Sequence, residues 1–256
     1  MTSWDPSEYM RFGDERTRPS VDLAARIADE SPARVIDLGC GPGNSTRVLR
    51  ARWPEARIIG LDNSAEMIES ARSEQPEGEW VLAGIEDWAA DSPFDVVFSS
   101  AALQWIPSHA ALVESLFANV TSGGAFAFQI PSAAFAAVRT LIHNIALEGP
   151  WADRMVGPLG ELTMEAPGLY YDRLAPLARA VDIWETEYFH VMDSAPAIVD
   201  WIATTGLRRF LAALESEEET QAFLALLHER VARSYRPQLD GRVLFPFKRT
   251  FVIAYR

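Results

Sequence analysis

The sequence predicts an α/β fold with a doubly wound, mostly parallel sheet, on three observations. Apolar strand-like runs alternate with helix-like runs from residue 34 to residue 130. A glycine-rich turn, Gly39-Cys-Gly-Pro-Gly43, joins the first strand to the next helix, and an acid, Asp62, ends the second strand. Alternating strands and helices are typical of a parallel sheet. A strand, a glycine turn and a helix in that order bring backbone close to a ligand.

Seven strands are expected, and helices are expected between them. The predicted strands are 34–38, 57–62, 79–83, 94–99, 125–130, 181–192 and 242–254. The predicted helices are 21–28, 44–53, a helix after Ser64, 110–120, 133–147, 170–180, 195–214 with an interruption near Gly206, and 217–235. Ser64, Ser108 and Ser216 are candidate N-caps, because a serine oxygen can accept from the backbone N–H groups that begin a helix.

The expected organisation is one domain, 1–256, with additions around a cofactor-binding core. Residues 1–30 are a predicted N-terminal helical lid, 31–131 the core, and 132–240 helical cap insertions that include one sheet strand at 181–192. Residues 241–256 carry the last strand. Long connections with helices of their own usually cover a site.

Composition excludes some functions. The chain has 256 residues and a formal net charge of −13, so a nucleic acid partner is not expected, since phosphate binding needs a basic face. Its one cysteine, Cys40, permits no internal disulfide, which suits a reducing cytoplasm. We expect no signal peptide and no membrane-spanning segment. We also expect no metal site, because no cysteine pair or HExxH motif is present.

The residues around the turn indicate which cofactor it holds. Asp62 can accept from both ribose hydroxyls of an adenosine, which suits NAD and S-adenosylmethionine alike. The dinucleotide fingerprint needs a glycine at position 44, where the chain has Asn44. Asp37 suits a cationic sulfonium and ammonium better than a pyrophosphate. An NAD-dependent oxidoreductase is therefore the weaker alternative.

The run Asp37-Leu-Gly-Cys-Gly-Pro-Gly43 resembles the first motif of the class I S-adenosylmethionine-dependent methyltransferases, which have a Rossmann-like fold. The resemblance implies contacts to each part of this cofactor. Gly39, Cys40 and Gly41 would line the methionine part, Asp62 would hold the ribose, Asn63 and Ile85 would flank the adenine, and the Ser99 carbonyl would accept from the ammonium. Gly84 stands where this family usually has an acid that binds the adenine amino group, so Glu86 or Asp87 would supply that acceptor.

Motifs outside the turn resemble the trans-aconitate 2-methyltransferases, from the first ten residues to the last strand. They include Trp4-Asp-Pro-Ser-Glu-Tyr9, Leu103-Gln-Trp-Ile-Pro107, Tyr170-Tyr-Asp172, Asp182-Ile-Trp184, Tyr188-Phe-His190 and Thr205-Gly-Leu-Arg208. The resemblance implies methyl transfer to a carboxylate of trans-aconitate, a tricarboxylate. A carboxylate is ionised at neutral pH and needs no general base, so we expect no catalytic residue beyond those that position the reactants and exclude water.

A tricarboxylate needs cationic and hydroxyl partners in this acidic chain, and arginine binds a carboxylate through two parallel hydrogen bonds. The candidate substrate contacts are Arg18, Trp105, Tyr170, Tyr171, His190, Arg208 and Arg249. Each also has a structural interpretation, in the core, at a helix end or on a solvated face. The alternatives for function are a methyltransferase of another small acid or of a hydroxyl, and a non-catalytic protein that binds S-adenosylmethionine. A monomer or a weak homodimer is expected.

Overall fold

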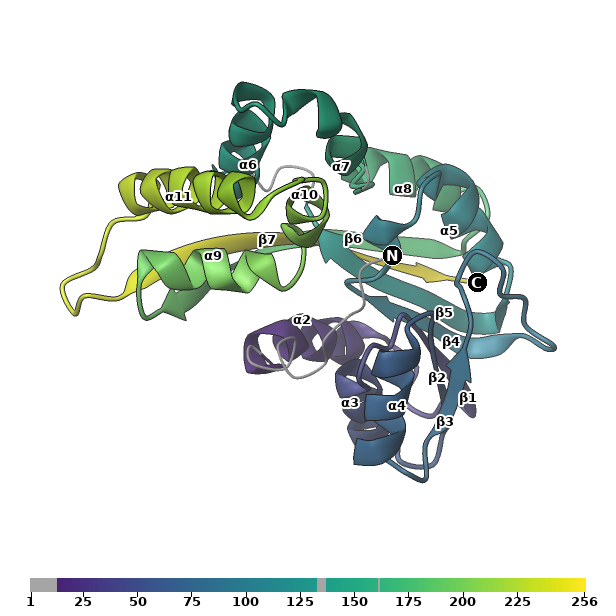
Figure 1. The fold of residues 1–256 in the computed structure, drawn as a ribbon. Coiled ribbons are helices and arrows are strands. Elements are labelled where there is room, and N and C mark those ends of the chain that lie inside the picture. Colours follow the sequence, from purple (N-terminus) through teal and green to yellow (C-terminus); the bar gives the residue numbers. More distant parts are fainter. Residues whose placement is uncertain (1–12, 133–136, 161) are drawn as a thin grey trace. The chain divides into compact units, whose positions relative to one another are not determined.

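The computed structural model describes residues 13–132, 137–160 and 162–256 as helices, strands and connections (Figure 1). Its sheet has seven strands in the order β3-β2-β1-β4-β5-β7-β6. The strands are β1 (Arg34–Leu38), β2 (Arg57–Asp62), β3 (Glu79–Leu82), β4 (Phe94–Ser100), β5 (Val120–Pro131), β6 (Ala180–Met192) and β7 (Val243–Tyr255). The helices are α2 (Gly13–Arg26), α3 (Asn44–Arg52), α4 (Ala65–Glu74), η1 (Leu103–Trp105), α5 (His109–Phe117), α6 (Ala137–Glu148), η2 (Ala152–Arg154), α7 (Val156–Gly160), α8 (Pro167–Leu174), α9 (Ala195–Ala203), α10 (Arg208–Leu211) and α11 (Glu217–Ser234).

The predicted α/β class and the mostly parallel sheet are confirmed. Strands β3, β2, β1, β4 and β5 pair in parallel, and β7 pairs antiparallel with β5. The order places β1 between β2 and β4, so β2 and β3 follow on one side of β1 and the later strands follow on its other side. The order of strand addition therefore reverses at β1. A crevice for ligands forms at such a reversal, outside the carboxyl ends of the strands.

The chain divides into two compact units. One comprises residues 13–132, 163–186 and 249–256, and the other comprises the helices between 137 and 160 together with residues 187–248. Strands β6 and β7 each contribute residues to both units. Most of the second unit falls within the predicted cap, and the division of one domain into lid, core and cap stays a prediction.

In the first unit, helices cover both faces of the sheet. Helices α5 and α8 lie on one face, and α2, α3 and α4 lie on the other (Figure 1). The core under α5 and α8 includes Phe126, Phe128, Tyr170 and Val252, each 0% exposed. Strand β4 is buried on both of its faces, as its continuous apolar run predicted.

The helix starts show where local signals decide and where they fail. Ser64 accepts from the Met67 N–H at 3.3 Å and Ser216 from the Glu219 N–H at 3.2 Å, which confirms both caps. Ser108 precedes α5 as expected, but its φ is 60° and its side chain makes no cap hydrogen bond, so that cap was predicted wrongly. Helix α2 begins at Gly13, eight residues before the predicted start, and continues through Pro19.

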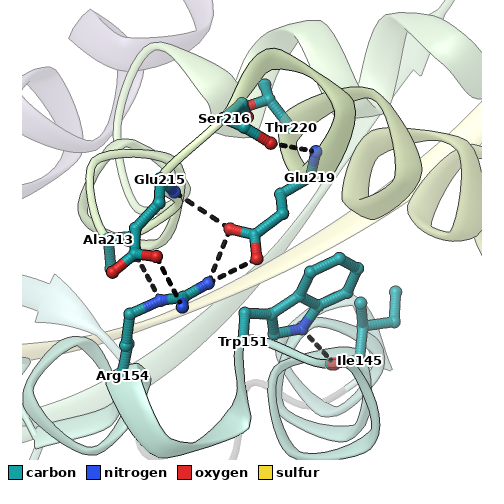
Figure 2. Close-up of polar contacts among 8 residues, drawn as sticks. All are labelled: Ile145, Trp151, Arg154, Ala213, Glu215, Ser216, Glu219 and Thr220. Atoms are coloured by element: carbon teal, nitrogen blue, oxygen red, sulfur yellow. Dashed lines mark hydrogen bonds and ion pairs between the residues drawn. The ribbon is translucent and has the colours of Figure 1, made fainter.

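In the second unit, contacts of Arg154 join the segment after α6 to the start of helix α11. Arg154 of η2 donates to both carboxylate oxygens of Glu219 at 2.6 Å, forms an ion pair with Glu215 at 3.1 Å and donates to the Ala213 carbonyl (Figure 2). The Glu219 carboxylate also accepts from the Glu215 N–H at 2.9 Å. The start of α11, which packs against α6 and α9, is therefore tied to the segment that follows α6.

Trp151 provides the apolar counterpart of this contact. Its indole is 2% exposed and packs against Phe223 of α11 at 5.2 Å between ring centroids. The indole N–H donates to the Ile145 carbonyl at 2.9 Å (Figure 2). In the described part of the chain, no helix combines the length and the apolar content that crossing a membrane would need.

Candidate cofactor and acceptor site

The glycine turn leaves β1 in a conformation that suits glycine, and it leaves space beside its backbone. Gly39 and Gly41 have φ values of 73° and 55°, which residues with a Cβ rarely adopt. A Cβ on Gly39 would lie 2.1 Å from the Ala102 Cβ, so the loop after β4 packs directly against the turn. A Cβ on Gly41 would meet nothing within 4 Å, so this position faces open space that a ligand can occupy.

Asp37 places a buried carboxylate below this turn. It is 0% exposed, and one oxygen, Oδ2, accepts from the hydroxyls of Ser45 at 2.6 Å and Thr46 at 2.7 Å. Its other oxygen, Oδ1, has no hydrogen-bond partner among the described residues. Burial, with a smaller contribution from the charge of Asp62, raises the pKa of Asp37 to about 6, although the two hydroxyl donors lower it. A buried acceptor without a partner is costly unless a ligand supplies the donor.

Asp62 brings a second carboxylate to the same turn. Its Oδ2 accepts from the Gly41 N–H and its Oδ1 from the Ser64 N–H, both at 2.9 Å. Burial raises the pKa of Asp62, while these backbone donors lower it. Each carboxylate oxygen can accept more than one hydrogen bond, so both keep capacity for hydroxyl groups of a ligand. Two acids and open space at Gly41 suit a ligand with cationic and hydroxyl groups.

The other predicted cofactor residues differ in how far they can reach a ligand. Ile85 is 9% exposed and lies next to Gly39, whereas Asn63 and Glu86 are exposed. A Cβ on Gly84 would lie 3.4 Å from Oε2 of Glu86 and 3.6 Å from Oδ2 of Asp87, so both candidate carboxylates lie beside the position that lacks the acid. Ser99 is 0% exposed, and its hydroxyl donates to the Leu38 carbonyl at 2.8 Å.

Cys40 faces away from the open side of the turn. Its side chain is 1% exposed and packs with Ile68, Ala71 and Trp80. Burial raises the pKa of the Cys40 thiol most, and the negative charge of Asp37 raises it further. Cys40 can therefore contribute its backbone to a ligand, while its thiol belongs to the packing behind the turn.

Trp80 supports the turn from behind, and sequence reasoning missed it. Hypothetical Cβ atoms on Gly43 and Gly60 would lie 2.8 Å and 2.5 Å from its indole, so each glycine admits the ring. The indole donates to the Gln75 carbonyl at 3.2 Å, and the Gln75 side chain donates to the Gly43 carbonyl at 3.0 Å. These contacts join residues far apart in the chain, so no local pattern could have indicated them.

Among the predicted acceptor residues, Tyr170 is placed differently from the expectation. It is 0% exposed, and its hydroxyl lies 2.6 Å from Nδ1 of His109. Since Nε2 of His109 must donate to the Leu103 carbonyl at 2.8 Å, Nδ1 accepts and the tyrosine hydroxyl donates. Tyr170 thus holds the loop after β4 through His109. Its contact with the substrate stays a prediction, while the structure gives its hydroxyl this structural partner.

The remaining acceptor candidates divide by exposure and by unit. Tyr171 is 54% exposed, Arg18 is exposed and Trp105 is half-buried, whereas Arg249 is 5% exposed and donates to Oε1 of Gln129 at 2.9 Å. On α2 it is Arg16, at 6% exposure, that is buried in place of Arg18.

His190 and Arg208 belong to the second unit. His190 stacks on Trp201 at 4.7 Å between ring centroids and is 5% exposed, and Arg208 begins α10. The motif Trp4–Tyr9 and the first part of the predicted lid lie outside the described residues.

Comparisons with known proteins identify the family. The family described as "Methyltransferase domain" matches residues 9–168. The trans-aconitate 2-methyltransferase of Azoarcus sp. (strain BH72) is 45% identical over 256 residues, with all of both chains covered. The protein of the same name from Methylobacterium radiotolerans is 44% identical over 259 residues, covering 99% of this chain and 98% of its own.

The chain belongs to the trans-aconitate 2-methyltransferase family.

Solved structures of low sequence identity share the fold. The YcgJ protein of Bacillus subtilis has a TM-score of 0.61 at 14% identity, with 93% of this chain and 98% of that chain covered. Coclaurine N-methyltransferase, solved with N-methylheliamine and S-adenosylhomocysteine, has a TM-score of 0.56 at 14% identity, with 94% of this chain and 73% of that chain covered. The chain is accordingly an S-adenosylmethionine-dependent methyltransferase with a Rossmann-like fold.

Proposed function

We propose that this chain transfers a methyl group from S-adenosylmethionine to one carboxylate of trans-aconitate, giving a monomethyl ester and S-adenosylhomocysteine. The observation that carries the proposal is similarity over the full length, at 41–45% identity, to proteins named trans-aconitate 2-methyltransferase. That similarity continues past residue 168, where the match to the methyltransferase domain ends. It therefore includes the residues between 187 and 248, where acceptor-specific contacts are expected.

The residues of the turn fit S-adenosylmethionine. Asp37 offers Oδ1 to a cationic donor such as the ammonium, and neutralising its buried charge would remove an electrostatic cost. Asp62 lies at the end of β2, where its carboxylate can accept from ribose hydroxyls. Gly41 allows close backbone approach on the open side of the turn, while Gly39 lets the loop after β4 pack against the turn.

The adenine and methionine contacts follow the same edge of the sheet. Ile85 and Asn63 would flank the adenine ring, and Glu86 would accept from its amino group in place of the acid missing at Gly84. The Ser99 carbonyl and the Cys40 backbone would face the methionine part. The Ser99 hydroxyl donates a hydrogen bond to the Leu38 carbonyl, which fixes the end of β4 against the end of β1. This contact supports the proposed role of the Ser99 carbonyl.

The transfer itself needs orientation and exclusion of water more than proton transfer. S-adenosylmethionine supplies a methyl group on a positively charged sulfur. A carboxylate oxygen of the acceptor forms the new bond to the methyl carbon while the carbon–sulfur pair passes to the sulfur, so no proton has to leave. Free carboxylic acids have a pKa of about 4 and are ionised at neutral pH. Positioning alone can lower such a barrier by about 7–11 kcal/mol.

The proposed acceptor contacts are Arg18, Trp105, Tyr171, His190, Arg208 and Arg249, with Tyr170 left out because its hydroxyl is used by His109. The proposal includes a small-molecule acceptor with no nucleic acid partner, in keeping with the net charge of −13. It also includes a cytoplasmic location, in keeping with the single cysteine, and a monomer or weak homodimer.

A panel of acceptors tests this function against its rivals. The purified protein is incubated with methyl-labelled S-adenosylmethionine and, separately, with trans-aconitate, other small di- and tricarboxylic acids, monocarboxylic acids and hydroxyl compounds. We expect the highest kcat/KM with trans-aconitate. A higher value with another acid or a hydroxyl compound would replace the proposed acceptor. Tight binding of S-adenosylhomocysteine without turnover of any acceptor would indicate a non-catalytic binding protein.

A further inference from the structure

A chain of hydrogen bonds crosses the first unit from α2 to β7. The hydroxyl oxygens of Ser20 and Ser100 lie 2.7 Å apart, and Ser100 accepts from Nε2 of Gln129 at 2.8 Å. Gln129 in turn accepts from the guanidinium of Arg249 at 2.9 Å. Ser20, Gln129 and Arg249 are each 5% exposed or less, so these bonds form in a place with little water.

The donors and acceptors fix the orientation of Gln129. An arginine only donates, so the amide oxygen must face Arg249 and the amide nitrogen must face Ser100. An amide oxygen orients a guanidinium without cancelling its charge, whereas a carboxylate at this position would form an ion pair with it. Gln129 thus contributes an amide oxygen, and not a carboxylate, to the contacts of the buried Arg249.

This chain of bonds ends at the edge of the sheet that holds the glycine turn. Ser100 is the last residue of β4 and pairs in register with Gln129 of β5. The next residue, Ala101, donates to the Gln129 carbonyl at 2.9 Å, and Ala102 packs against Gly39. Arg249 is therefore connected to the cofactor turn through consecutive residues, at the carboxyl ends of β4 and β5 where α/β folds bind ligands.

A second buried arginine lies at the same edge. The carbonyl of Arg26, at the end of α2, accepts from the hydroxyl of Tyr255, the last residue of β7, at 3.4 Å. Ser20 contacts the carboxyl end of β4 and Arg26 contacts the last residue of β7, so α2 runs in the same direction as β7. Arg16 is one helical turn before Ser20 and is 6% exposed, so it lies towards the edge formed by the carboxyl ends of β4 and β5.

We propose that Arg16 and Arg249 bind carboxylates of the acceptor, and that Gln129 is a positioning residue that orients the guanidinium of Arg249. The inference rests on the proposed function, since it concerns the acceptor of that reaction. A carboxylate held by an arginine has its lone pairs engaged in hydrogen bonds and is the weaker nucleophile. The carboxylate that receives the methyl group is then one that neither arginine holds, and the site selects acids with several carboxylates over monocarboxylic acids.

The test replaces Gln129 by glutamate, which keeps the shape of the side chain and places a carboxylate on Arg249. We expect Gln129→Glu to raise KM for trans-aconitate by about tenfold or more, with Kd for S-adenosylhomocysteine unchanged. Arg249→Lys and Arg16→Lys should act in the same direction. Arg26→Gln is the matched control, because Arg26 lies on the same helix but pairs with Asp182 at the exposed surface.

The preference among acceptors gives a second reading that loss of stability would not reproduce. Relative to the wild type, Arg249→Lys and Gln129→Glu should lose more kcat/KM with trans-aconitate than with an unsaturated monocarboxylic acid. If Gln129→Glu does not fold, the two lysine variants decide. Wild-type values of KM and of the preference in both lysine variants would overturn the inference. Failure of the proposed function shows separately, as absence of trans-aconitate turnover in the wild-type protein.

Discussion

At the scale of single residues, Asp37 shows how the fold keeps a costly group for binding. Its carboxylate is fully buried, two hydroxyls stabilise one oxygen, and the other oxygen has no partner among the described residues. In the folded chain its pKa is about 6, above the 3.8 of a solvated aspartate. Between these values the folded chain binds a proton that the unfolded chain has released. The free energy of unfolding therefore falls as the pH rises through this window, by about 3 kcal/mol in all.

Asp37→Asn should separate this stability cost from cofactor binding. Without ligand, we expect the variant to be more stable than the wild type at pH 7.5, and the difference to vanish as the pH approaches 4, because asparagine does not titrate. The same variant should bind S-adenosylhomocysteine more weakly at pH 7.5. Thermal unfolding against pH and calorimetric titration measure the two effects. Parallel stability profiles for both proteins would show that Asp37 does not carry the raised pKa.

Tyr170→Phe tests the structural role of the Tyr170 hydroxyl. Removing the hydroxyl leaves Nδ1 of the buried His109 without its donor, so stability should fall by about 1–3 kcal/mol. KM for trans-aconitate should stay near the wild-type value, because the hydroxyl serves the loop after β4. Denaturant unfolding and steady-state kinetics check both. A large rise in KM with unchanged stability would restore Tyr170 as a substrate contact.

The sequence predicts the residues whose role follows from local order along the chain. Asp37 and Asp62 could be recognised because each stands next to a strand end or a glycine turn. The burial of Arg16 in place of Arg18 could not be predicted, because it depends on the phase of α2. That phase is hidden by the early helix start and by Pro19. The contact of Tyr170 with His109 could not be predicted, because the two residues are 61 positions apart in the chain.

At the scale of elements, the cofactor turn depends on strand β3 as well as on β1. Trp80 of β3 fills the space that Gly43 and Gly60 leave, and it shares the cluster of Cys40 and α4. The ring is rigid, so a larger residue in β2 must displace either the indole or the turn. The open side of the turn can be shaped for a ligand because the closed side is packed.

Gly60→Ala should therefore reduce both stability and cofactor affinity. A Cβ there would lie 2.5 Å from the Trp80 ring, and such overpacking costs about 1–3 kcal/mol. Gly168→Ala in α8 is the control, since its Cβ would meet nothing within 4 Å and alanine favours a helix. Trp80→Phe should recover part of the loss in the double variant. If Gly60→Ala matched the control in unfolding and in S-adenosylhomocysteine binding, the support by Trp80 would be refuted.

In the second unit, the contact of Arg154 with Glu219 should stabilise the start of α11. The hydrogen bond from the Glu215 N–H is the largest cause that lowers the pKa of Glu219, and Arg154 lowers this pKa further. The stabilisation of the folded state by the Glu219 carboxylate is therefore present at neutral pH and is lost as the pH falls. Glu219→Gln should lower Tm at pH 7 more than Glu218→Gln, an exposed neighbour in the same turn. Equal Tm values for the two variants at pH 7 would mean that the contact shown in Figure 2 contributes nothing.

At the scale of the whole molecule, alternation along the chain was sufficient to predict the sheet. The predicted bounds of β1 and β2 agree with the structure. Those of β3, β4 and β6 differ by one residue at one end, and those of β7 differ by one residue at each end. The start of β5 at Val120 was missed, since Gly123-Gly124 indicated a turn and the irregular register between Phe94 and Val96 accommodates it within the strand. Strand order and the contacts behind the turn depend on residues distant in sequence, which periodicity does not encode.

The similarity to the trans-aconitate 2-methyltransferases covers both units of the chain, so the proposed acceptor is tested on the whole protein. The most direct measurement is one reaction of the purified protein with methyl-labelled S-adenosylmethionine and trans-aconitate, followed by product identification. The proposed function predicts one labelled methyl group per product molecule, an equal amount of S-adenosylhomocysteine, and release of the label as methanol on mild alkaline hydrolysis. An alkali-stable label, or no labelled product although S-adenosylhomocysteine binds, would contradict it.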